Sequence, residues 1–315
     1  MNCSPDLYSI IFADCSMISL SRRNVSVLRI ADLYKWEKPV LSLEVFPPKP
    51  GSSLKTVFRT LDGLRDVNPS FVSVTYASQG HTVERTVEIA SRVRDEYGCE
   101  SLAHVTCIGQ TTSQVSELLD ELESRGISNI LALRGDIPEE GKPLCTDYIY
   151  ASGLVTHIRE RGGFCIGAAA YPEGHFESAR ISTDLSYLKK KVDAGAEFLI
   201  SQLFFDNRVF YDFLERTDSL GIKVPVVPGI MPILNYKQIK RILMMCRVSV
   251  PAKLLNLFDK YSSDPEALAQ AGVEYATRQV SDLVDNGVSG IHLYTMNRVA
   301  QIRTIVHDSG LRELQ

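Results

Sequence analysis

The sequence contains no CxxC pair, no GxGxxG motif and no apolar run long enough to span a bilayer. Because CxxC pairs are missing and the seven cysteines are an odd number, neither a disulfide framework nor a zinc ribbon is indicated. The missing glycine motif leaves a Rossmann nucleotide site without support. A net charge of −4 gives no electrostatic reason to expect nucleic acid or an anionic membrane as partner. We therefore expect a reducing, cytoplasmic setting.

What is present is enough apolar sequence for one large core. Hydrophobic residues make up 44% of the 315 residues, a length that is normal for a single α/β barrel. The first thirty residues mix charges such as Asp6, Asp14 and Arg22 with short apolar pieces, which makes a poor signal peptide. We expect residues 1–28 to be a dispensable or disordered N-terminal extension and residues 29–315 to form the barrel.

Short apolar runs alternate with helical patterns from residue 40 to the end. The runs are nearly continuous, as expected for parallel strands that are covered on both faces. They lie at residues 40–46, 70–75, 101–106, 129–133, 164–170, 198–203, 224–228 and 290–294. Apolar residues recur at helical spacing between them, and Asp264 before Pro265 indicates the start of a long helix. Strict alternation of eight such units predicts a single (β/α)8 TIM-type barrel, with residues 246–263 as an added helical elaboration.

Polar groups gather where the predicted strands end. The carboxyl ends of barrel strands build the active site, and loops begin at the same places, so the pattern alone leaves a structural interpretation open. Glu44 weakens that interpretation because it lies inside an apolar strand, where a carboxylate must be paired, protonated or functional. His104 and His175 lack clear ligand partners in the sequence, so no metal site is predicted.

Nine sequence motifs, in order along the chain, carry a family resemblance. They are SLEVFPP (42–48), FVSVTY (71–76), HVTC (104–107), ALRGD (132–136), AAYPE (169–173), KVDAGA (191–196), QLFFD (202–206), PGIMP (228–232) and YTMNR (294–298). Together they resemble the successive signatures of the methylenetetrahydrofolate reductase family over roughly residues 38–310. One such match would be weak evidence, whereas nine in order are specific.

The resemblance implies an enzyme that holds FAD at the C-terminal face of the strands without a Rossmann module. NADH or NADPH would reduce the flavin, which would then reduce 5,10-methylenetetrahydrofolate to 5-methyltetrahydrofolate for methionine synthesis. A protein electron donor stays open, because no motif separates the donors. The resemblance also implies a homo-oligomer. Because no regulatory half follows, it further implies the compact, catalytic-only form.

Three residues match the family's chemistry directly. Glu44 matches the general acid, which protonates a ring nitrogen of the folate so that the ring opens to an iminium cation that accepts hydride. Burial in an apolar strand favours the protonated form that such an acid needs. Asp136 matches the aspartate that hydrogen-bonds the pterin near the flavin. Gln202 matches a pterin-binding glutamine, whose amide donates and accepts in one plane.

The remaining matches concern binding. The positions that match FAD contacts in the family are Thr75, His104, Arg134, Gly135, Asp136, Ala151, Tyr171, His175, Asp184, Lys190 and Lys191. Tyr236 stands where a phenylalanine that stacks on substrate is familiar, and Arg298 is expected to contact folate or cofactor. Tyr187 departs from the pattern, because a polar side chain often reaches the cofactor from its position.

Two alternatives compete with this interpretation. One is a non-redox barrel that binds folate or a corrinoid within a methyl-transfer complex. Glu44, Asp136 and Gln202 together argue against it, because a carrier has no use for the acid. The other is a lyase or aldolase on the same fold, since the fold alone does not fix the function. Neither a Schiff-base lysine nor a metal cluster stands out at the strand ends.

Overall fold

The computed structural model describes residues 28–35, 38–48, 51–76, 82–136 and 147–311. All but the last residue of the predicted N-terminal extension lie outside this part of the chain. The strands are β1 (Val40–Val45), β2 (Phe71–Val74), β3 (Glu100–Thr106), β4 (Asn129–Leu133), β5 (Cys165–Ala170), β6 (Phe198–Ser201), β7 (Val226–Val227), β8 (Gly229–Ile230) and β9 (Gly290–Tyr294). The helices are α1 (Ile30–Leu33), α2 (Lys55–Leu64), α3 (Thr82–Tyr97), α4 (Thr112–Ser124), α5 (Ala151–Arg161), α6 (Ile181–Ala194), α7 (Asn207–Ser219), α8 (Tyr236–Cys246), α9 (Ala252–Lys260), α10 (Pro265–Asp285) and α11 (Val299–Asp308), with the 3-10 turn η1 (Arg65–Val67).

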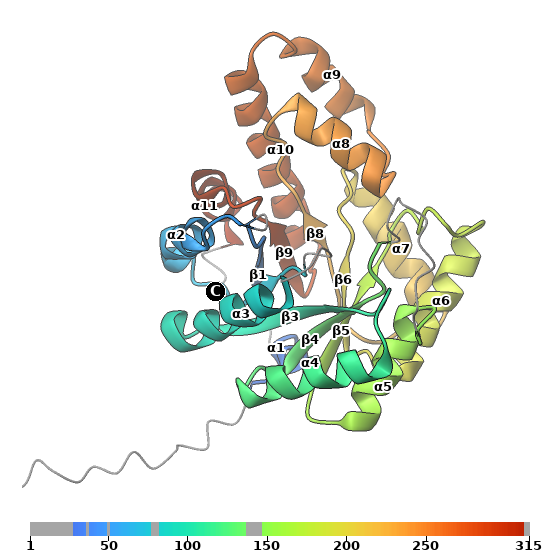
Figure 1. Ribbon diagram of the computed structural model, residues 1–315. Helices are drawn as coiled ribbons and strands as arrows, with labels where there is room; N and C mark the ends of the chain where they lie inside the picture. Colours follow the sequence, from blue (N-terminus) through green and yellow to red (C-terminus); the bar gives the residue numbers. More distant parts are fainter. Residues whose placement is uncertain (1–27, 36–37, 49–50, 77–81, 137–146, 312–315) are drawn as a thin grey trace, which may run out of the picture.

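All strand pairs are parallel, and the sheet order runs β7-β6-β5-β4-β3-β2-β1-β9-β8. Its two end strands, β7 and β8, are separated in the chain by Pro228 alone, so the sheet is a nearly closed barrel. Helices cover its outside (Figure 1). The predicted α/β barrel is thereby confirmed.

The expected strand at 224–228 differs most from the structure. Only Val226–Val227 of it form a strand, β7, which pairs with β6; a second short strand, β8, follows Pro228 and pairs with β9. Proline has no N–H to give to a ladder, so the pairing changes partner there. Its carbonyl still accepts a hydrogen bond from the His292 N–H at 3.0 Å, which holds the two halves to the sheet.

The helical patterns of the sequence correspond to buried helix faces. In α2, Val57, Phe58 and Leu61 are buried against the barrel, as their i+3, i+4 and i+7 spacing from Leu54 predicts. Asp264 caps α10 by accepting a hydrogen bond from the Ala267 N–H, with Pro265 in the first turn. The elaboration predicted at 246–263 is α9, which packs with α8 and α10 around its own apolar cluster.

The two ends of the barrel differ in what covers them. At the amino ends of the strands, the backbone of α1 is fixed by Asn129, whose Oδ1 accepts from the Ile30 N–H at 2.9 Å. Beyond the carboxyl ends, α8 and α9 stand above the sheet (Figure 1). Among the described residues no helix combines the length and apolar character that a membrane crossing requires.

Candidate active site

Glu44 lies near the carboxyl end of β1, level with Ser73 of β2 and Tyr294 of β9. Only 5% of the residue is exposed, so the carboxyl group sits in the barrel wall. Its Oε2 atom is 3.3 Å from Nε2 of His292 and 3.6 Å from Nε2 of His104. Two imidazoles from opposite sides of β1 therefore face one buried carboxyl oxygen.

A serine fixes the ring of each histidine. The Ser42 hydroxyl is 2.8 Å from Nδ1 of His292, and the Ser73 hydroxyl is 2.6 Å from Nε2 of His104. Burial lowers the pKa of His104 from 6.5 to about 4, against an opposing effect of Glu44. His104 is therefore neutral near pH 7.

The hydrogen bonds around His292 permit two proton arrangements when its ring is neutral. The Ser42 hydroxyl donates to the Ile291 carbonyl at 3.3 Å, which leaves it to accept from Nδ1–H of His292. Nε2 then carries no proton, and its contact with Glu44 requires a protonated carboxyl group that donates to it. If Ser42 instead donates to Nδ1, Nε2 carries the proton and Glu44 is a carboxylate. The Glu44 carboxyl group therefore lies within hydrogen-bond reach of the His292 ring in either tautomer.

The end of β9 anchors the backbone around Glu44. The N–H and the hydroxyl of Thr295 both donate to the Glu44 carbonyl, at 3.2 and 2.6 Å. The amide of Asn297 pairs with the N–H and carbonyl of Phe46, at 3.2 and 3.0 Å. This turn requires left-handed backbone at Met296 and Asn297, with φ of 49° and 54°. The YTMNR motif therefore holds the strand that carries Glu44 in position.

Arg134, Gly135 and Asp136 follow β4 directly. Arg134 forms a two-pronged ion pair with Glu177, with N–O distances of 2.5 and 2.8 Å. Gly135 has a φ of 86°, which favours glycine, and a Cβ there would come within 2.7 Å of the Ile108 side chain. Asp136 is exposed at the rim of the barrel, where the carboxyl ends of the strands lie. Burial raises the pKa of Tyr171, and the Asp136 charge adds to that shift.

The loop after β5 and the helix α6 carry four of the predicted cofactor-binding residues, Tyr171, His175, Asp184 and Lys191. Tyr171 and His175 meet edge to face, with ring centroids 4.7 Å apart. Lys191 donates from Nζ to the Ala169 carbonyl. Burial lowers the pKa of Lys191 to about 8, with Asp184 opposing the shift. Asp184 is itself buried and accepts from the Ser178 hydroxyl at 3.2 Å.

Gln202 and Thr75 complete the inner rim. The Gln202 N–H donates to the Ala170 carbonyl at 2.7 Å, and its Oε1 accepts from the Leu203 N–H at 2.9 Å. No hydrogen bond joins its Nε2 to any residue that the structure describes. The Thr75 N–H donates to the Val45 carbonyl at 3.2 Å. The Gln202 amide group therefore keeps donors for a bound molecule.

The other predicted binding residues lie farther out. Ala151 begins α5, and Lys190 is exposed on α6. Tyr236 begins α8, is 58% exposed and contacts Phe258 of α9 edge to face. The exposed Arg298 side chain has no polar contact within the described part of the chain. The structure does not bring Tyr236 or Arg298 into direct contact with Glu44.

Sequence reasoning left His292 unassigned and did not single out Ser42 or Ser73. A polar residue between Ile291 and Leu293 in an apolar strand is the same signal that Glu44 gives. Only the pairing of β1 with β9 and β2 shows that these residues converge.

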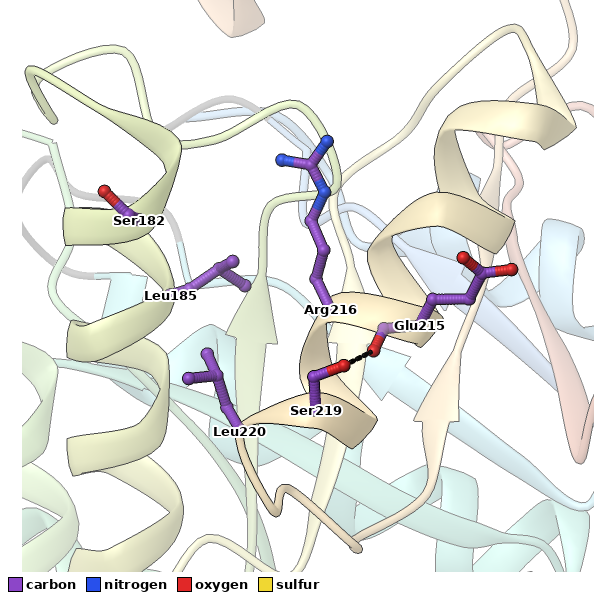
Figure 2. Close-up of a pocket in the computed structure, with 6 residues that line it drawn as sticks. All are labelled: Ser182, Leu185, Glu215, Arg216, Ser219 and Leu220. Atoms are coloured by element: carbon purple, nitrogen blue, oxygen red, sulfur yellow. Dashed lines mark hydrogen bonds between the residues drawn. The ribbon is translucent and has the colours of Figure 1, made fainter.

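A separate surface pocket lies between α6 and α7, outside the barrel (Figure 2). Its volume is about 360 Å³, and none of the predicted site residues lines it. It is lined by Ser182, Leu185, Glu215, Arg216, Ser219 and Leu220. Among the described residues no group of three or more His, Cys, Asp or Glu side chains is placed to hold a metal ion.

The fold and the site define a barrel enzyme with a buried carboxyl acid at the carboxyl ends of its strands. Comparison with known proteins makes the class specific, because the model of the family described as methylenetetrahydrofolate reductase matches residues 29–310. The chain belongs to the methylenetetrahydrofolate reductase family.

Individual relatives agree with this assignment. The chain is 39% identical over 273 residues to the 5,10-methylenetetrahydrofolate reductase of Escherichia coli K12, covering 86% of this chain and 91% of that one. It is 36% identical to methylenetetrahydrofolate reductase (NADH) 1 of Arabidopsis thaliana, covering 85% of this chain and 48% of that one.

A relative from Caenorhabditis elegans, named as a probable NADPH form, is 35% identical over 91% of this chain and 44% of its own. A solved structure from Clostridium thermocellum, described as an uncharacterised protein that binds two copies of 5-methyl-5,6,7,8-tetrahydrofolic acid, has a TM-score of 0.66. It is 12% identical and covers 91% of this chain and 100% of its own, so it supports the fold alone.

Proposed function

We propose that this protein reduces 5,10-methylenetetrahydrofolate to 5-methyltetrahydrofolate with electrons from NADH or NADPH that pass through bound FAD. The observation that carries the proposal is the buried Glu44 carboxyl group between two serine-held histidines at the end of β1. Family membership and relatives named as NADH and NADPH forms support the same reaction.

Glu44 supplies the proton that the folate needs. The methylene carbon of the substrate is held in a ring between two nitrogens, and hydride cannot easily attack it there. A proton moved from the Glu44 carboxyl to one of these nitrogens opens the ring to an iminium cation, which accepts hydride. Ser42 holds the His292 ring, and the ring in turn holds that carboxyl group in position. Asp136 then places a negative charge at the rim, where it stabilises the cation.

The rim residues suit a flavin dinucleotide in the chemistry of their donors. Lys191 offers a cation, as a pyrophosphate requires, while Gln202 offers free amide donors to the pterin of the substrate. Tyr171 and His175 offer aromatic surface beside them. Thr75, His104, Gly135, Asp136, Ala151, Asp184 and Lys190 would complete the binding surface. Arg134 would act as a neutralised pair with Glu177. When bound, FAD supplies a carrier that takes hydride from one molecule and gives it to another.

The test is an anaerobic visible spectrum of the purified protein, before and after NADH, NADPH and then methylenetetrahydrofolate. We expect a flavin spectrum that one nicotinamide bleaches and the folate restores. Bound flavin that neither nicotinamide bleaches would point to a protein electron donor. A colourless protein that FAD cannot reconstitute would contradict the reductase and favour a non-redox folate- or corrinoid-binding barrel.

The setting forms part of the same proposal. Among the described residues, Cys99, Cys165 and Cys246 are free thiols, which fits a reducing cytoplasm. We propose that the protein works there as a homo-oligomer. Light scattering coupled to size exclusion checks this, and a mass of 35.1 kDa, that of one chain, would contradict it.

A further inference from the structure

The helices α8 and α9 form a cap above the carboxyl ends of the strands (Figure 1). Of the eleven residues of α8, all of which the structure describes, Ile239 alone is buried, while Met244 and Met245 are exposed. A helix that buries so little apolar surface is held weakly by packing. The position of this α8–α9 cap therefore depends on a few specific contacts.

The end of α8 lies within electrostatic reach of the rim. Cys246 is the last residue of the helix; burial raises the pKa of its thiol to about 11, and the charge of Asp136 adds to that shift. Burial also raises the pKa of Tyr171, with a smaller contribution from Cys246. The cap is therefore close to the loops that follow β4 and β5.

One specific contact joins the cap to the loop after β5. The N–H of Ser249, which lies between α8 and α9, donates to Oε2 of Glu173 at 2.8 Å. The two residues are 76 positions apart in the chain, so the hydrogen bond connects two separate segments. A hydrogen bond to a carboxylate is stronger than one to a neutral acceptor. Glu173 therefore clasps the cap to this loop.

A second contact joins the same two segments. The Arg247 guanidinium lies over the Phe176 ring, 4.8 Å from its centroid, within the range of a cation–π contact. Phe176 stacks on His175, with ring centroids 4.8 Å apart, and His175 meets Tyr171 edge to face. A row of contacts thus runs from the end of β5 to the residue that follows α8.

The clasp is close to a balance between a closed and an open state. The other carboxylate oxygen of Glu173, Oε1, is buried and has no hydrogen-bond partner in the described part of the chain. A buried acceptor without a donor costs about as much free energy as one hydrogen bond contributes. Opening of the cap would break the bond to Ser249 and return Oε1 to water, so the two effects would offset each other.

We propose that Glu173 is a positioning residue, whose bond to Ser249 holds the α8–α9 cap closed and so governs how substrates enter and leave the rim. Tyr236, which is expected to stack on a substrate, begins α8, so a movement of the helix moves this ring as well. The inference rests on the proposed function, in which a nicotinamide and a folate must reach the flavin in turn. The closed cap retains a bound substrate, and the open cap exchanges it for the next.

Hydrogen–deuterium exchange of the α8 amides tests the clasp without reference to activity. In Glu173→Ala the amides of residues 236–246 should exchange on the order of fivefold faster, because the lost hydrogen bond is partly offset by removal of the unsatisfied oxygen. Glu173→Gln keeps an oxygen acceptor for the Ser249 N–H and should stay within about twofold of wild type. Glu160→Ala, which removes an exposed carboxylate of α5, is the control and should change nothing.

Stopped-flow reduction of the bound flavin by NADH and by NADPH tests the consequence for substrate exchange. Glu173→Ala should raise the half-saturating nicotinamide concentration on the order of fivefold, the same factor as the α8 exchange. The limiting rate of reduction should stay within about twofold of wild type, because the clasp touches neither reacting atom. Arg247→Gln removes the cation over Phe176 and should shift both readouts in the same direction.

Three outcomes separate the clasp from the proposed function. Unchanged α8 exchange in Glu173→Ala would overturn the clasp. Faster exchange with an unchanged half-saturating concentration would overturn its role in substrate entry and release. If neither nicotinamide reduced the wild-type flavin while α8 exchange still responded to Glu173→Ala, the proposed function would be contradicted and the clasp would stand.

Discussion

Replacing Glu44 by Gln tests the proposed acid while leaving the other parts of the site unchanged. The two side chains have nearly the same size and shape, so the amide can still form the 3.3 Å contact with Nε2 of His292. Folding should therefore change by no more than about 1 kcal/mol, the net contribution of one hydrogen bond. What the amide cannot do is release a proton to a folate nitrogen.

The two halves of the reaction should respond differently. General acid catalysis contributes roughly 10²- to 10⁴-fold, which corresponds to about 3–5 kcal/mol of the activation barrier. We expect the rate of folate reduction by the Glu44→Gln variant to fall by that factor. Hydride transfer from the nicotinamide requires no acid, so flavin reduction should stay within about twofold of wild type.

Anaerobic stopped-flow absorbance resolves the two steps, because flavin absorbance falls in the first and returns in the second. Glu160→Gln is a suitable control, since Glu160 is exposed near the end of α5, away from the rim. If the Glu44→Gln variant reduced folate within threefold of the wild-type rate, Glu44 would not be the acid. Equal slowing of both steps would point to damaged flavin binding instead.

Two further predictions concern stability. His104, with its pKa lowered from 6.5 to about 4, stays neutral in the fold while the unfolded chain binds a proton, so stability should fall as pH drops from about 6.5 to 4. The free energy of unfolding should fall by about 2 kcal/mol at pH 5. Urea titrations at pH 7 and 5 measure this loss, and His104→Gln should remove it. A variant with the same pH dependence as wild type would refute this cause. Gly229→Ala would place its Cβ 2.3 Å from the Ser201 carbonyl and should cost at least about 2 kcal/mol. Gly153→Ala, whose Cβ would meet only Tyr148 at 3.6 Å, should add about 0.5–1 kcal/mol; equal effects of the two variants would contradict the packing argument.

The barrel could be predicted from the sequence because its strands are short apolar runs with clear helical patterns between them. The expected strands 129–133 and 290–294 match β4 and β9 residue for residue. The division of the seventh strand at Pro228 could not be predicted, because it depends on which neighbours the strand has when the sheet closes. Sequence periodicity records which residues are buried and carries no information on which strand pairs with which.

The site could be predicted in part for the same reason. Glu44 stood out because a carboxyl group in an apolar strand demands an explanation. His292 carries an equal anomaly, but a single neutral histidine is common in protein cores, so it did not stand out. Its role depends on the register that places Ser42 opposite His292 and Glu44 opposite Tyr294.

The pairing of β1 with β9 also determines when the active site can exist. Glu44 and His292 are 248 residues apart, and a ribosome that adds 5–20 residues per second needs about 10–50 s to make the chain between them. During that interval the edge of β1 that will pair with β9 has no partner strand, and unpaired edges promote aggregation. Glu44 is thus among the first parts of the candidate site to be synthesised and among the last to be assembled. A chain that stops before β9 would lack both His292 and the turn that anchors Glu44.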